Sequence, residues 1–389
     1  MIFLSLKVDN LYMFQDVTLD FTYSRRVKNS LIEGEYLEEF PNVRFKRVCV
    51  IMGPNAAGKT TLGRLMCAIN NYLLERRPIE QVRENIYDTS KPAMVDLLYV
   101  VPVLKELRRL RIELDTRGLK RETLWTMPLR KSKSLTQMKA ALNESQPVFD
   151  WPEPDQAAVG DADNVALFSQ ARLKGVALDR ASGWHYIFCE MDVSSDNLTH
   201  EQQDLVLLEK VLRAFDGSIV SVQLSQDKDN AYVIAFQNGD RVIVEDGQLR
   251  PSDRQRLSRG TLESIEMAKL LASVIRQGKD SPEVSHTFFL DEKMAYSHTE
   301  MEVAILNVMI ERLGRYSQLF YTTHNHDILS MALPSHSYLF MYKDGFVRFA
   351  HPEKKGFRKN DRNLLGYVRN DIFGTMPDTG LIDALLEDT

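Results

Sequence analysis

The sequence predicts an α/β protein with an antiparallel β element at its N-terminus and an inserted helical, basic subdomain. Apolar and polar residues alternate along the first 21 positions, as in strands with one buried face. Short apolar runs then alternate with segments of helical periodicity, at 48–74 and again beyond 201, which is typical of α/β folds. Residues 102–139, between these parts, are strongly basic. With 389 residues, 44% of them hydrophobic, the chain can fill a large core.

A first lobe is expected over residues 1–100. Its first 21 residues should form two strands around 10–16, because apolar side chains occupy alternate positions at Phe3, Val17, Leu19 and Phe21. The run Val48–Met52 is rich in β-branched residues and is followed by a glycine, which predicts a buried parallel strand. A helix should follow from Thr60 to about Leu74, with one apolar face made by Leu62, Leu65, Met66 and Ile69.

An inserted subdomain is expected over 101–200, as an arm or partner surface. Basic side chains clearly outnumber acidic ones between 102 and 139, and Arg108, Arg109 and Arg111 are clustered. A solvated charged face and a surface for nucleic acid or a partner both remain open for this run. The acidic stretch 147–163 contains two prolines and is expected to be a loop or linker.

The second lobe is expected over 201–350, with a tail at 351–389 that packs on it. Apolar periodicity predicts helices at 201–215, 261–276 and 301–313. Strands are expected at 219–224, 232–236, 241–244, 287–290 and 318–322. Asn238-Gly239, between two of these strands, is a strong signal for a two-residue hairpin turn.

Composition excludes several classes of protein. The net charge of -5 and pI near 6.0 argue against a uniformly basic coat for nucleic acid. No stretch has the roughly 18 to 20 apolar residues of a membrane helix, and the start lacks the apolar core of a signal peptide. The three cysteines show no CxxC pairing. These features predict a cytoplasmic, reduced protein without a membrane partner.

A phosphate-binding motif follows the strand at 48–52. Residues 53–60 fit GxxxxGK[ST], in the order Gly53, Pro54, Asn55, Ala56, Ala57, Gly58, Lys59 and Thr60, and Thr61 continues the helix. Glycines let backbone N–H groups wrap phosphates, and the helix N-terminus adds partial positive charge. Lys59 should contact the β- and γ-phosphates, and the Thr60 hydroxyl should bind Mg²⁺. ATP and Mg²⁺ are therefore the expected ligands.

Two later strands end in polar residues. The strand at 287–290 delivers Asp291 and Glu292 to the carboxyl edge of the sheet. Asp291 suits Mg²⁺, and Glu292 suits the base that orients or deprotonates an attacking water. The strand at 318–322 leads to His324, which could hydrogen-bond the γ-phosphate.

A candidate anion site begins the helix near 261. Ser258 and Gly260 immediately precede this helix, and a helix N-terminus favours anions. The alternative is an ordinary capped helix with Ser258 or Thr261 as its N-cap.

With these motifs in order, the chain resembles the ATP-binding-cassette (ABC) superfamily, in the soluble branch of the SMC, Rad50 and RecF heads and the OLD-type ATPases. It is most similar to the AAA15 group of bacterial ATPases, in Ser258–Thr261, Thr322–Asn325 and the ending at 368–377. The resemblance implies a P-loop NTPase fold of ABC type. It also implies a homodimer, or a higher homo-oligomer, that sandwiches ATP, with Ser258 and Gly260 reaching the γ-phosphate in trans. Ser297 and His298 match the D-loop, and His324 matches the switch histidine.

The resemblance implies an ATPase that senses or controls a separately encoded effector or a nucleic acid, in a bacterial anti-phage or toxin–antitoxin-like system. A DNA-repair or chromosome-maintenance ATPase of RecF or Rad50 type is one alternative. A nuclease that uses His351 and the basic stretch 354–362 is another. Tyr12 and Phe14 are candidates for stacking on adenine, while Gln81 and Gln137 both remain possible for the Q-loop.

Overall fold

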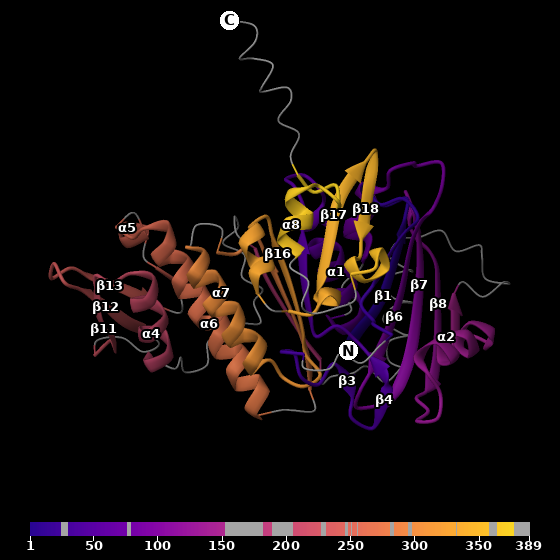
Figure 1. Cartoon of the computed structure of the whole chain (residues 1–389), viewed down its shortest axis with the longest axis horizontal. Coiled ribbons are helices and arrows are strands. Elements are labelled where there is room, and N and C mark those ends of the chain that lie inside the picture. Colours follow the sequence, from indigo (N-terminus) through magenta and orange to yellow (C-terminus); the bar gives the residue numbers. More distant parts are fainter. Residues whose placement is uncertain are drawn as a thin grey trace, which may run out of the picture.

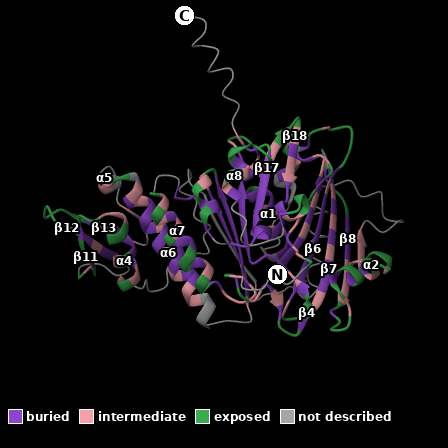
Figure 2. Ribbon diagram, viewed as in Figure 1, coloured by how far each residue is buried: buried purple, intermediate pink, exposed green. Residues whose placement is uncertain are grey.

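Two six-stranded sheets form the body of the protein, in a computed structural model (Figure 1). A smaller lobe extends from one side. Buried residues fill the space between the two sheets (Figure 2). The structure describes residues 1–24, 30–75, 79–151, 182–188, 205–226, 231–245, 248–249, 251–254, 256–280, 284–294, 298–331, 333–357 and 364–376.

The N-terminal sheet is antiparallel and has the order β2-β1-β6-β7-β8-β9. In β1, Phe3, Leu6 and Val8 face the core, which confirms the two expected N-terminal strands. The helix α2 (Leu135–Glu144) and the short pair β3 (Tyr36–Leu37) and β4 (Phe40–Arg44) cover the opposite face. The strands are β1 (Ile2–Asp9), β2 (Val17–Asp20), β6 (Ala93–Val101), β7 (Glu106–Asp115), β8 (Gly118–Pro128) and β9 (Phe149–Trp151).

The prediction of a helical insertion is wrong for the first part of 101–200, where strands form instead. Its boundary falls inside β6, and β7 and β8 extend the N-terminal sheet. The high charge content of this segment concealed the alternation typical of a strand, because Leu110, Ile112 and Leu114 are buried between charged neighbours of both signs. Residues 182–188 were expected inside the same insertion, but they form strand β10 (Ser182–Phe188), which pairs with β15 of the other sheet. The residues 152–181 and 189–204 lie outside the described residues.

The second sheet has the order β10-β15-β16-β5-β17-β18, and its first five strands are parallel. Strand β5 (Val48–Met52) is buried along its whole length, as its apolar run predicts. Strand β16 separates β5 from β15 and places its Thr322 opposite both Ile51 and Asp291. The remaining strands are β15 (Ser285–Asp291), β16 (Gln318–Thr323), β17 (Tyr338–Asp344) and the antiparallel β18 (Phe346–Ala350).

Helix α1 (Lys59–Asn70) packs between the two sheets and continues as a π-helical turn at Asn71–Glu75. On the other face of the second sheet lie α6 (Arg259–Asp280) and α7 (Thr299–Arg312) (Figure 1). Near the C-terminus, α8 (Leu364–Arg369) packs into the same core. The 3-10 helices are Ile79–Asn85, His326–Ser330, Ser335–Ser337 and Pro352–Lys355.

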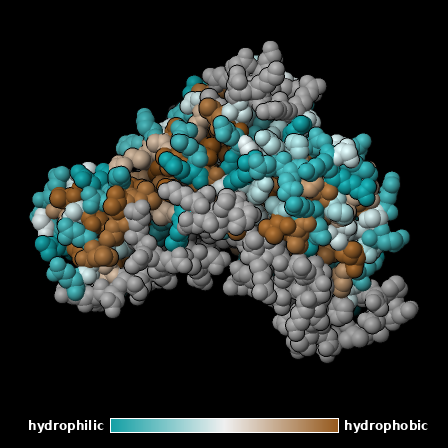
Figure 3. Space-filling model, turned by 90° about the horizontal axis from the view of Figure 1, so that it is seen from below, coloured by the Kyte–Doolittle hydropathy of each residue, from teal (hydrophilic) through white to brown (hydrophobic). Residues whose placement is uncertain are grey.

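The small lobe combines α4 with a four-stranded antiparallel sheet and joins the body through α6 (Figure 1). The hairpin between β12 and β13 turns at Asn238-Gly239, where Gly239 has φ +87°, so that prediction is confirmed. Apolar residues gather on this end of the molecule, and Val220 and Leu224 are exposed there (Figure 3). The elements are α4 (Leu205–Phe215), β11 (Ile219–Leu224), β12 (Ala231–Phe236), β13 (Arg241–Glu245), β14 (Gln248–Leu249) and α5 (Pro251–Arg254).

Among the described residues, no helix is long and apolar enough to cross a membrane.

The clustered arginines on β7 are bound within the N-terminal sheet. Arg109 donates to both carboxylate oxygens of Asp96, at 2.8 and 2.5 Å, and its guanidinium lies 5.0 Å from the Trp125 ring centre. Arg111 donates to the same Asp96 carboxylate at 3.0 and 3.1 Å. Arg108 pairs with Glu106 at 2.7 Å. These contacts favour a structural role for the three side chains.

Replacing Arg109 by Ala should therefore lower the free energy of unfolding by about 2 kcal/mol, because a charge-assisted pair is lost and the carboxylate of Asp96 stays largely buried. Chemical denaturation of the purified chain measures this. Arg117→Ala is the matched control, since that side chain is 89% exposed and should change stability by less than about 0.5 kcal/mol. Equal stability of Arg109→Ala and wild type would contradict the structural role.

Candidate functional site

The backbone of the loop between β5 and α1 requires glycine at two positions, Gly53 and Gly58. A Cβ at Gly53 would lie 2.3 Å from the carbonyl oxygen of Met341 on β17, so the loop passes directly against that strand. Gly58, the N-cap of α1, has φ +102°, and Ala56 has φ +60°. No side chain caps the N-terminus of α1, and its first turn holds no acidic residue. Its first N–H groups are therefore suited to an anion.

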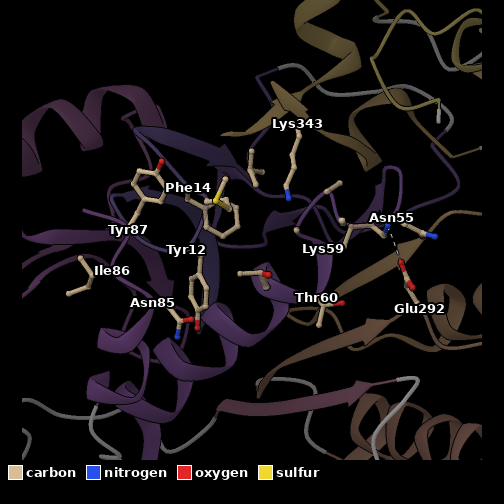
Figure 4. A pocket seen from close by; sticks show the side chains of 16 residues that line it. Tyr12, Phe14, Asn55, Lys59, Thr60, Asn85, Ile86, Tyr87, Glu292 and Lys343 are labelled. Carbon is tan, nitrogen blue, oxygen red and sulfur yellow. Dashed lines mark ion pairs between the residues drawn. The ribbon is translucent and has the colours of Figure 1, made fainter. Parts of the chain in front are cut away.

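Lys59 is only 4% exposed, and its ammonium has three acceptors. It donates to the carbonyl oxygens of Gly53 at 2.8 Å and Pro54 at 3.1 Å. Its third contact is an ion pair with Oε1 of Glu292 at 3.0 Å (Figure 4). Each N–H of the ammonium thus has one acceptor, which offsets the cost of burying the charge.

The two carboxylates at the end of β15 have different surroundings. Asp291 is fully buried, and the hydroxyl of Thr322 donates to its Oδ1 at 2.6 Å. Glu292 is 29% exposed, and its backbone N–H donates to Oγ1 of Thr322 at 2.9 Å. Glu292 also has φ +50°, a strained conformation for this residue type. Thr322 on the intervening β16 therefore fixes the turn that aims Glu292 at the loop.

A cavity of about 800 Å³ opens beside the loop and α1 (Figure 4). This volume is in the range of small-molecule sites. Gly53 and Pro54 do not line the cavity, but their carbonyls hold Lys59 at its edge. Asp291 does not line it either. The predicted site residues that do line the cavity are Asn55, Ala56, Ala57, Gly58, Lys59, Thr60, Thr61 and Glu292.

Aromatic residues form the wall opposite the loop. Tyr12 lines the cavity, and its backbone N–H donates to the carbonyl of Asn85 at 2.6 Å. Burial raises the pKa of its hydroxyl, which therefore stays neutral. Phe14 also lines the cavity but is otherwise fully buried and stacks on Phe349. Tyr87 is 55% exposed and packs edge-on against Phe346. Tyr12 and Tyr87 thus present the more accessible rings.

Sequence reasoning missed six residues that line this cavity, which are Met13, Asn85, Ile86, Tyr87, Lys343 and Val347. No local motif marks them, because they are brought together by long-range backbone contacts. Asn85 joins Tyr12, and the N–H of Val347 donates to the carbonyl of Met13 at 3.0 Å. Thr322 could have been found, since it is the polar residue at the end of an apolar strand.

Ser258, Gly260 and His324 do not line the cavity of their own chain. Ser258 is the N-cap of α6, because its Oγ accepts from the N–H of Thr261 at 3.0 Å. The Thr261 hydroxyl in turn donates to Asp216 at 2.9 Å. The capped-helix interpretation is thus confirmed, and it is compatible with an anion site. His324 is exposed at the end of β16.

The other candidates fall into three groups. Gln137 completes the capping box of α2 with Ser134, so that side chain is occupied there. His298 is the N-cap residue of α7, while Ser297 lies outside the described residues.

His351 is 5% exposed, and burial together with Lys46 and Lys354 lowers its pKa to about 3. It is therefore neutral and poorly placed for the nuclease alternative.

Two candidate oxygen ligands for a divalent cation lie after β5 and at the end of β15, and one of them, Asp291, is fully buried and does not line the cavity. Thr60 supplies a hydroxyl at the cavity, and Asp291 supplies a carboxylate at the end of β15. Both are hard donors of the kind Mg²⁺ prefers, and Mg²⁺ usually takes only one or two protein ligands. Among the described residues, no group of three or more His, Cys, Asp or Glu could hold a metal ion. Two protein oxygens of this kind fit an Mg²⁺ ion that takes its other ligands from water or phosphate.

Comparison with known proteins gives matches among solved structures alone. No family model matches the chain. No curated protein matches it either. Among solved structures, the chain is similar to the SMC head domain from Thermotoga maritima, with 14% sequence identity and a TM-score of 0.45. The similarity covers 90% of this chain and 99% of that one.

Gly53→Ala should lower the free energy of unfolding by about 1–3 kcal/mol, because the new methyl group meets a backbone oxygen that cannot rotate away. Thermal or chemical denaturation measures the change. Gly217→Ala is the control, since nothing lies within 4 Å of a Cβ at that position. If Gly53→Ala were as stable as wild type, the loop would not be in close contact with β17 at this position.

Proposed function

We propose that this chain is an ABC-type ATPase that binds Mg²⁺–ATP in the cavity beside Lys59. One observation carries the proposal: Lys59 of the phosphate-binding loop and Glu292 of β15 meet at 3.0 Å on the rim of one cavity. The loop sequence, its uncapped helix N-terminus and the two carboxylates at the end of a parallel strand support the same activity.

In the proposed complex, the phosphates lie against the N-terminus of α1. Lys59 then exchanges Glu292 and two backbone carbonyls for oxygens of the β- and γ-phosphates. The base lies toward the half-buried ring of Tyr12 and the exposed ring of Tyr87, which are available for stacking. The cavity thus has a cationic end for phosphates and an aromatic end for adenine.

Thr60 and Asp291 would hold the Mg²⁺ ion, which when bound neutralises charge on the phosphate oxygens. The Thr322 hydroxyl donates to one oxygen of Asp291 and so holds the carboxylate in a defined orientation. Once Lys59 has moved to the phosphates, Glu292 is free to accept a proton. A water oxygen then attacks the γ-phosphorus, its proton passes to Glu292, and the bond from phosphorus to the ADP oxygen breaks.

A head-to-tail dimer is part of the proposal. Ser258 and Gly260 begin α6, outside the cavity of their own chain, so a second copy would bring them to the γ-phosphate. His324, exposed at the end of β16, would report on the same phosphate. Two copies would then close on two ATP molecules. What supports this arrangement is the sequence resemblance together with the separation of Ser258 from the cavity.

For the biological role, we propose an OLD-like ATPase of the AAA15 group that controls a separately encoded effector in bacterial anti-phage defence or a toxin–antitoxin-like system. This step rests on the sequence resemblance, and the genes beside this one in its genome would test it. A nucleic-acid surface on β7 gains no support, because Arg109 and Arg111 both pair with Asp96. A repair ATPase of RecF or Rad50 type remains the alternative role.

Glu292→Gln should bind ATP about three- to tenfold more tightly, because the amide no longer competes for the Lys59 ammonium or repels the γ-phosphate. Turnover should fall about 10²- to 10³-fold, because the amide cannot accept the water proton. Calorimetric titration and steady-state phosphate release measure the two effects. Glu311→Gln, on the exposed side of α7, is the control and should match wild type. Rapid turnover by Glu292→Gln would remove Glu292 as the base.

Mixing two inactive variants tests the dimer. Lys59→Ala should not bind ATP, and Ser258→Arg should bind ATP but fail to close, because a bulky cation replaces a small hydroxyl. A mixed dimer has one site with both lesions and one intact site. When equal amounts of the two variants exchange subunits freely, half of the dimers are mixed, and each mixed dimer has one intact site of two. The mixture should therefore recover about a quarter of the wild-type ATPase rate if the two sites hydrolyse ATP independently.

Ser258→Arg also removes a helix cap, which alone costs about 1 kcal/mol. Ser134→Arg is therefore the matched control, because it removes the cap of α2 outside the site and should keep its ATPase activity. If Ser258→Arg alone keeps full ATPase activity, the role of Ser258 is limited to capping α6. If the mixed variants exchange subunits but recover no ATPase activity, the two subunits do not form composite sites that work independently.

A further inference from the structure

The hairpin of β17 and β18 is a wall of the cavity that no motif predicted. Gly53 passes against the carbonyl of Met341, and a Cβ at Gly58 would lie 3.2 Å from Cγ2 of Val347. On its other side, the N–H of Val347 donates to the carbonyl of Met13 at 3.0 Å. The hairpin is therefore anchored both to the phosphate-binding loop and to the turn that carries the aromatic wall.

Lys343 lies on this hairpin in register with Val347, and both residues line the cavity. Its side chain is exposed, and its amine end turns toward the space between Phe14 and Lys59 (Figure 4). Within the part of the chain that the structure describes, Lys343 makes no ion pair, whereas Lys59 has Glu292. The cavity thus receives a second positive charge, which no carboxylate of the described residues neutralises.

We infer that Lys343 is a second phosphate-binding residue, which contacts the α- and β-phosphates of the nucleotide. The inference rests on the proposed function. Lys59, at the start of α1, takes the β- and γ-phosphates, and the base lies toward Tyr12 and Tyr87. The part of the nucleotide between those two ends must then pass the hairpin, where the Lys343 ammonium is available. An unpaired cation beside apolar walls attracts phosphate more strongly than one in open water.

This position has consequences that differ from those of Lys59. ATP and ADP share their α- and β-phosphates, so loss of the Lys343 charge should weaken both by the same factor. The interaction is equal before and during hydrolysis, so KM should rise while kcat stays within about twofold of wild type. The loss should shrink as salt is raised, because the Lys343 side chain is reached by solvent.

The experiment measures ATP and ADP binding to the full chain, by calorimetric titration with Mg²⁺, for a charge series at one position. Lys343→Arg should bind like wild type, Lys343→Gln should bind both nucleotides about tenfold more weakly, and Lys343→Glu should be weaker still. Lys131→Gln is the matched control, because that exposed lysine does not line the cavity and should leave both affinities unchanged. Denaturation curves of each variant confirm that it is folded.

Unchanged ATP and ADP affinity in Lys343→Gln would overturn the inference and leave the proposed function standing. A loss for ATP alone would place Lys343 at the γ-phosphate and also overturn it. An equal loss in Lys343→Arg and Lys343→Gln would show that the packing of the hairpin matters and the charge does not. Absence of ATP binding by the wild-type chain itself would overturn the proposed function, and this inference with it.

Discussion

The Lys59 ammonium must be neutralised in every state of the protein, because a buried charge without partners costs several kcal/mol. The structure meets this need with two loop carbonyls and Glu292. Those three acceptors come from the loop after β5 and from the end of β15, so the pair requires both strands to end at the same sheet edge. Parallel pairing through β16 provides that arrangement. A bound polyphosphate would replace the same three partners, which couples ligand binding to the release of Glu292.

Backbone contacts, more than side chains, give the cavity its shape. Gly53 lets the loop touch β17, and the 12–14 turn joins both the segment at 85 and the β17–β18 hairpin. The turn requires left-handed backbone at Asn10 and Tyr12, with φ +55° and +53°. The amide nitrogen of Asn10 supports it, because this nitrogen lies within hydrogen-bond distance of three carbonyls, those of Asp88, Lys91 and Pro92. Such strained positions persist only where surrounding contacts hold them, as they do around this cavity.

Local sequence signals predicted the parts of the fold and site that depend on neighbours along the chain. The strand at 48–52, the loop at 53–60 and the Asn238-Gly239 turn all follow from spacing within a few residues. Strands β7 and β8 were missed because charged residues, Arg111 and Glu113, occupy the positions between Leu110, Ile112 and Leu114, and the charge count concealed the alternation. Tyr87 and Lys343 could not be predicted, since only contacts between distant segments bring them to the cavity.

The end of β15 is also bound to the helix that carries Ser258. Lys293, the residue after Glu292, is nearly buried and forms an ion pair with Glu266 of α6. The Tyr321 hydroxyl lies within hydrogen-bond distance of both the Lys293 carbonyl, at 3.0 Å, and the carboxylate of Glu302 on α7. Breaking such a buried pair leaves a charge without a partner, so β15 and α6 should move together. A displacement of Glu292 caused by ligand binding would therefore reach the N-terminus of α6, where Ser258 lies. In the proposed dimer, this path would connect Glu292, the proposed base of one site, to the surface proposed to complete the other.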